Sequence, residues 1–120
     1  MAKVLLVGYI RELLEERNNA LHAAGHQVTL ALGGEAAYLT ISQEVFDVAV
    51  LGYSVPEAER NEVARRLTQS NPGVKIVMVY FTSLKNTELA HALIPTTASA
   101  QDVVRAVKHV LNPDDESKTG

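Results

Sequence analysis

The sequence predicts an α/β domain with a parallel five-stranded sheet and helices on both of its faces. Short runs that are almost continuously apolar recur along the chain, which is typical of strands buried on both faces of a sheet. Segments with helical periodicity separate these runs, and Gly, Pro or a capping sequence stands where helices should begin or end. The 120 residues, 47% of them hydrophobic and 21% charged, are enough for one soluble domain with one core.

The first strand and helix are expected near the start of the chain. Residues 3–7, KVLLV, are an apolar run, and residues 10–24 follow with a helical stripe that includes Leu14 and Leu21. Gly25 is suited to end this helix. The charged residues of the helix are expected to form a solvated face: Arg11, Glu12, Glu15, Glu16 and Arg17.

The second and third strands enclose a short helix. Residues 27–31 alternate between polar and apolar and predict a strand, and Gly33-Gly34 predicts a turn. Residues 35–43 fit a short helix, and residues 46–51, FDVAVL, predict a third, largely apolar strand.

The fourth unit is clear, but the pattern then weakens. Residues 56–70 fit a helix with Pro56 in its first turn, and the turn Asn71-Pro72-Gly73 follows. Residues 74–80 are the most apolar run of the chain. Residues 82–92 leave room only for a short helix.

The last unit closes the domain, which is predicted to span residues 1–112. Residues 91–94 fit a final strand, and the capping box Ser99-Ala-Gln-Asp102 opens a helix that runs to Leu111. Residues 113–120 are polar and are expected to form a disordered tail. Right-handed crossovers favour the flavodoxin-like strand order 2-1-3-4-5, with functional residues beyond the carboxyl ends of the strands.

Several segments resemble, in order and with similar spacing, the receiver domains of bacterial response regulators, the CheY-like superfamily. The resemblance covers about residues 3–111, and it rests on five segments: residues 4–7 (VLLV), 21–28 (LHAAGHQV), 34–37 (GEAA), 46–51 followed by Val55-Pro56, and Ile94-Pro95 where the family has Lys-Pro.

The resemblance implies a phosphorylation site, and the chain departs from it at five positions. Receivers hold Mg²⁺ with an acidic pair after the first strand, which here is Gly8 and Tyr9, and accept the phosphoryl group on an Asp, which here is Gly52. The Ser or Thr and the Lys that contact the phosphoryl oxygens fall on Tyr80 and Ile94. The resemblance therefore implies a degenerate receiver, or pseudo-receiver, with no phosphoacceptor, no Mg²⁺ or other cofactor and no enzymatic activity.

A second departure concerns the fourth helix of the family. Only thirteen residues separate Tyr80 from Ile94, so this helix is expected to be short, distorted or absent. In the family, the surface around that helix often carries the output or dimer contact, and it should be remodelled here.

Aromatic residues gather near the predicted strand ends: Tyr9, Tyr53, Tyr80 and Phe81. They could form a binding patch for a partner, or they could fill the space left by the missing metal and phosphoryl group. The sequence leaves both interpretations open.

Composition narrows the remaining function classes. The chain has no Cys, a net charge of −3 and no apolar run long enough to span a bilayer, which disfavours thiol chemistry, nucleic-acid binding and membrane insertion and favours a cytoplasmic location. The expected function is that of a stand-alone receiver-like protein of two-component signal transduction that binds a sensor kinase, another signalling protein or a second copy of itself. A small-molecule-binding domain is the alternative. An enzyme of the same fold is disfavoured, because the strand ends offer no carboxylate, Lys or His.

Overall fold

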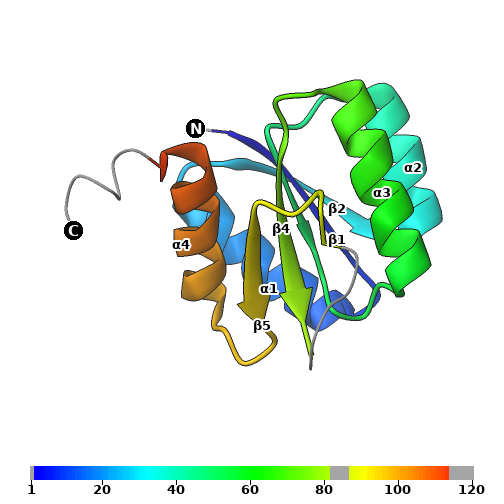
Figure 1. Cartoon of the computed structure of the whole chain (residues 1–120). Coiled ribbons are helices and arrows are strands. Elements are labelled where there is room, and N and C mark those ends of the chain that lie inside the picture. Colours follow the sequence, from blue (N-terminus) through cyan, green and yellow to red (C-terminus); the bar gives the residue numbers. More distant parts are fainter. Residues whose placement is uncertain (1, 82–86, 114–120) are drawn as a thin grey trace.

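The computed structural model describes residues 2–81 and 87–113, and its helices and strands alternate along the chain (Figure 1). Their order is β1 (Lys3–Gly8), α1 (Arg11–Ala23), β2 (Gln27–Leu32), α2 (Gly34–Gln43), β3 (Val48–Leu51), α3 (Glu57–Ser70), β4 (Lys75–Tyr80), β5 (Ala92–Pro95) and α4 (Ala100–Leu111).

The five strands form one parallel sheet in the order β2-β1-β3-β4-β5. This confirms the strand order expected from the sequence. Figure 1 shows α2 and α3 together on one face of the sheet and α1 and α4 on the other. Because all five strands are parallel, their carboxyl ends lie at the same edge of the sheet, called the carboxyl edge below.

Each face of the sheet has its own core. Alternate residues of β1 point to opposite faces: Leu5 and Val7 pack with α2 and α3, whereas Val4 and Leu6 pack with α1 and α4. All four of these side chains are fully buried, which is why the strand is apolar at nearly every position.

The third strand is shorter than predicted, because it begins at Val48 and not at residue 46. Phe46 is nonetheless buried, and the carboxylate of Asp47 accepts the backbone N–H of Lys3 at 2.8 Å. Pro56 also differs from expectation: it is the N-cap of α3, one residue before the helix. The capping box at the start of α4 is confirmed, since Ser99 and Asp102 each accept the other's backbone N–H.

The connection from β4 to β5 contains a turn at residues 88–89 and no helix among its described residues, which are 81 and 87–91. The rest of the expected short helix, residues 82–86, lies outside the described residues, as do residues 114–120 of the expected tail.

His91 extends the sheet beyond the start of β5. Its backbone N–H donates to the Ile76 carbonyl at 2.7 Å, and its Nδ1 accepts the Ile76 N–H at 3.0 Å. Burial and the nearby Lys75 hold the pKa of His91 below its ordinary value, which keeps Nδ1 free to accept. Within residues 2–81 and 87–113, no helix has the length and apolar character needed to cross a membrane.

Candidate functional site

The five positions singled out by the sequence converge on the carboxyl edge. Gly8 ends β1 and Tyr80 ends β4, Ile94 lies in β5, and Gly52 directly follows β3. The chain leaves β3 beside β1, because the N–H of Gly52 donates to the carbonyl of Val7 at 2.8 Å.

The side chain of Tyr9 extends from this edge toward α2 and α3. Its ring lies against Gly33, where a Cβ atom would come within 2.8 Å of the ring, and Gly33 has a φ of 92° that favours glycine. Its hydroxyl donates to the carboxylate of Glu59. The backbone N–H of Tyr9 donates to Ser54 Oγ at 2.9 Å. Tyr9 therefore connects the end of β1 to the β2–α2 turn and to α3.

Glu59 of α3 has a second partner, the backbone N–H of Gly34 at the start of α2. A carboxylate is favoured there because the first N–H groups of a helix lack partners within the helix. The hydrogen bond to Glu59 raises the pKa of Tyr9, an effect that the Gly34 N–H partly opposes, so the phenol stays a donor. Sequence reasoning missed Glu59, since its partners lie 50 and 25 residues away.

Arg17 also lies near the carboxyl edge, and the prediction that its side chain is exposed was wrong. The sequence placed Arg17 on a solvated helix face, but only 6% of the residue is exposed. The physical reason is helical spacing: Arg17 lies between the buried Leu14 and Leu21, on the stripe of α1 that faces the sheet. This spacing was the signal in the sequence that could have identified it.

The guanidinium of Arg17 lies beside Gly52, the position at which the resemblance in sequence places the acceptor. A Cβ atom on Gly52 would lie 3.6 Å from Arg17 Nη1 and 3.1 Å from the carbonyl oxygen of Val7. A cation thus lies beside Gly52, and the close approach that a side chain at position 52 would have to relieve is to the backbone carbonyl of Val7.

Arg17 has no hydrogen bond or ion pair to any residue in the described ranges 2–81 and 87–113. Within the same ranges, no side-chain nitrogen or oxygen is both fully buried and unpaired, so the guanidinium nitrogens keep contact with solvent. Burial lowers the pKa of Arg17, and the charges of Glu16 and Tyr53 oppose that effect. Arg remains protonated in proteins at physiological pH even so.

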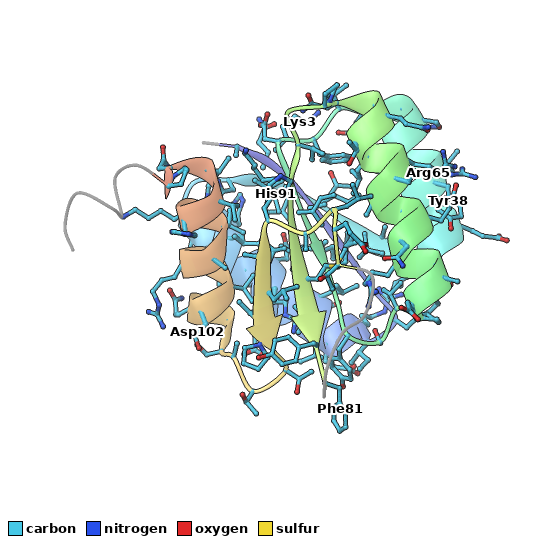
Figure 2. All side chains as sticks on the ribbon, viewed as in Figure 1. Lys3, Tyr38, Arg65, Phe81, His91 and Asp102 are labelled. Atoms are coloured by element: carbon cyan, nitrogen blue, oxygen red, sulfur yellow. The ribbon has the colours of Figure 1, made fainter. Side chains whose placement is uncertain are left out.

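Among the four aromatic residues near the strand ends, Tyr53 and Phe81 form a stacked pair of rings. Their ring centroids are 6.1 Å apart and their planes 29° apart, whereas Tyr9 is directed toward Glu59. Phe81 is 73% exposed, and Figure 2 shows its side chain projecting past the end of β4. Tyr53 and Phe81 thus form one stacked and partly exposed aromatic pair, and Tyr9, which is 51% exposed, lies apart from it.

The part of the chain that the structure describes contains no group of three or more His, Asp or Glu side chains that could hold a metal ion. The final residues of β1, β3, β4 and β5 include no carboxylate. Around the carboxyl edge the described residues thus include the cation of Arg17, the carboxylate of Glu59 held by Tyr9 and Gly34, and exposed aromatic rings.

No protein-family model matches the chain. The response regulator receiver protein CpdR of Brucella abortus (strain 2308) is 30% identical over 79 residues, which are 66% of each chain, so the match spans just under two thirds of that relative. A CheY-like response regulator receiver domain protein from Methanospirillum hungatei JF-1 superimposes with a TM-score of 0.82 at 25% identity, over 100% of this chain and 99% of the other. A receiver domain protein from Clostridium thermocellum gives a TM-score of 0.81 at 18% identity, over 96% and 98% of the two chains. Strand order, structural agreement over the whole domain and sequence similarity together place the chain among the CheY-like receiver domains of response regulators.

Proposed function

We propose that this receiver domain works in bacterial two-component signalling as a stand-alone cytoplasmic protein that binds another protein and is not phosphorylated on Asp. The observation that carries the proposal is the arrangement at Gly52. The position that follows β3 has no side chain, and the guanidinium of Arg17 lies beside it.

Phosphoryl transfer to a receiver needs a carboxylate nucleophile at the acceptor position. Gly52 has none, and its neighbours Gly8 and Tyr9 after β1 supply none. The hydroxyl of Tyr9 is engaged with Glu59, so this side chain is not available as a substitute.

Mg²⁺ binding is disfavoured at the same edge for an electrostatic reason. Mg²⁺ prefers carboxylate oxygens, whereas the charged group that the described residues place within contact distance of position 52 is the guanidinium of Arg17. We therefore expect neither Mg²⁺ nor another cofactor in this receiver.

A direct test treats the protein with acetyl phosphate, or with beryllofluoride, in the presence of Mg²⁺. Intact-mass spectrometry should show no phosphoryl adduct, and the melting temperature should not rise. A receiver domain that has its acceptor Asp serves as the positive control. A stoichiometric adduct, or stabilisation similar to that of the control, would refute the proposal.

The exposed stack of Tyr53 and Phe81 is the proposed contact surface for the partner, which is a sensor kinase, another signalling protein or a second copy of the chain. Exposed aromatic rings provide large contact areas at interfaces. The patch expected from the sequence also includes Tyr9 and Tyr80, which flank this pair at the ends of β1 and β4.

Phe81→Ser tests this surface, with Leu39→Ser on α2 as the matched control, since Leu39 is also exposed, at 60%. Binding to signalling proteins encoded near the gene is measured by interferometry, and self-association by analytical ultracentrifugation. We expect Phe81→Ser to weaken one of these interactions at least tenfold, with Leu39→Ser unchanged. Equal binding by the two variants would locate the interface elsewhere.

A further inference from the structure

We propose that the carboxyl edge at Gly52 is a binding site for one anionic group, a carboxylate or a phosphoryl group, which the guanidinium of Arg17 holds. This proposal goes beyond the proposed function, because contact through the Tyr53–Phe81 surface does not require a ligand.

The first argument is the unmatched charge of Arg17. A charged side chain with only 6% of its surface exposed is unfavourable unless a direct partner compensates it, and no described residue forms a hydrogen bond or ion pair with it. The exposed remainder lies at the guanidinium nitrogens, since no polar side-chain atom of the described residues is both fully buried and unpaired. The guanidinium therefore keeps a small contact with solvent through which an anion could approach it.

The second argument is a second hydrogen-bond donor close to the cation. Gly8 and Gly52 adjoin each other, because a Cβ on Gly52 would lie 3.7 Å from Gly8 Cα. A Cβ on Gly8 would lie 3.5 Å from Ser54 Oγ. Ser54 Oγ accepts the N–H of Tyr9, which leaves its own proton available for donation to a bound oxygen.

The third argument is the chemistry of the guanidinium. Its planar, fork-shaped set of N–H donors matches the paired oxygens of a carboxylate or a phosphoryl group. Glu16 on the same helix and Tyr53 act on it only through longer-range electrostatics. Neither forms an ion pair with it, so an added anion would be its direct partner.

The test follows the side-chain Nε–Hε resonance of Arg17 in ¹⁵N-labelled protein. Sodium acetate and sodium phosphate are added in separate titrations, with sodium chloride adjusted to hold the ionic strength constant. A saturable shift in the millimolar range, in at least one titration, is expected, and the anion that gives the lower Kd identifies the preferred chemistry. Linear shifts without saturation in both titrations would overturn the proposal.

Two variants make the test specific to Arg17. In Arg17→Gln, the saturable shifts of the backbone amides of Gly52 and Ser54 should disappear, whereas they should persist in Arg11→Gln, because Arg11 is an exposed Arg of the same helix. Saturable shifts that persist in Arg17→Gln would overturn the proposal.

Gly52→Asp gives an independent check that keeps Arg17 in place. The introduced carboxylate would start from a Cβ 3.6 Å from Arg17 Nη1 and should occupy the site from within the chain. We expect added acetate or phosphate to bind at least tenfold more weakly than to the unmodified protein, and unchanged affinity would place the site elsewhere. These outcomes do not depend on the acetyl phosphate test, so the two proposals can fail separately.

Discussion

Replacement of Arg17 by Met removes a buried charge from α1 and keeps an unbranched side chain of similar reach. Arg17 lies between Leu14, which is 2% exposed, and Leu21, which is 0% exposed, on the stripe that packs against the sheet. Met is a good helix former and adapts to irregular apolar surroundings, so the helix itself should not change.

The expected gain in stability follows from the missing partner. A buried polar group without a hydrogen-bond partner costs about 1–3 kcal/mol, and more when it is charged. The solvent contact of the guanidinium reduces this cost, and the aliphatic part of Arg17 already contributes some apolar packing. We therefore expect Arg17→Met to stabilise the domain by about 1–2 kcal/mol. For a chain of 120 residues this corresponds to a melting temperature higher by roughly 3–10 °C.

Urea denaturation followed by circular dichroism measures this change, with thermal melting as a second readout. Arg11→Met is the control and should shift stability by less than about 0.5 kcal/mol, because Arg11 is exposed. If Arg17→Met destabilised the domain by more than about 1 kcal/mol, the guanidinium would be making a net favourable interaction, and the reasoning about an unmatched charge would be wrong.

Three further predictions concern other parts of the fold. Gly25→Ala and Gly33→Ala both place a side chain at positive φ, 96° and 92°, but only the methyl group at position 33 meets the ring of Tyr9. By urea denaturation, Gly25→Ala should cost about 1 kcal/mol and Gly33→Ala clearly more. Equal costs would show that the ring contact is unimportant. Ser99→Ala removes the capping box of α4 and should cost about 1 kcal/mol in the same assay, whereas no loss would mean that the cap is dispensable. Hydrogen bonds from Arg65 and Arg66 lower the pKa of Glu62 to about 2, so the contribution of this carboxylate to stability is present above pH 4.5 and is lost as the pH falls toward 2. Glu62→Gln should therefore lose less stability between pH 6 and pH 3 than the unmodified protein. Equal losses in the two proteins would contradict this.

The sequence was sufficient for the architecture because its strands are buried on both faces. Residues 3–7 and 74–80 are apolar at nearly every position, and the structure places them in β1 and β4 of a parallel sheet. The capping box at Ser99 marked the start of α4 for an equally local reason. The start of β3 was placed two residues too early, since the burial of Phe46 comes from tertiary packing and not from strand pairing.

The side-chain contacts at the carboxyl edge were less predictable. The positions themselves followed from the resemblance and the spacing, and parallel strands bring them to one edge. The role of Glu59 depends on contacts with Tyr9 and Gly34 that join distant parts of the chain. Arg17 was misplaced because its residue type was given more weight than its position in the helix, i+3 from Leu14 and i−4 from Leu21.

The glycine at position 52 and the arginine at position 17 are best understood as one structural feature. In a receiver with an acceptor Asp, negative side chains at the strand ends create a field that favours a divalent cation. Here Gly8 and Gly52 contribute no charge, and the guanidinium of Arg17 lies within contact distance of position 52. If position 52 corresponds to the acceptor, as proposed above, the sign of the charge there is the reverse of that of an Asp, and a ligand that binds there should be an anion and not a metal ion. We therefore propose that the fold keeps a charged edge here while the class of ligand that this edge holds is different.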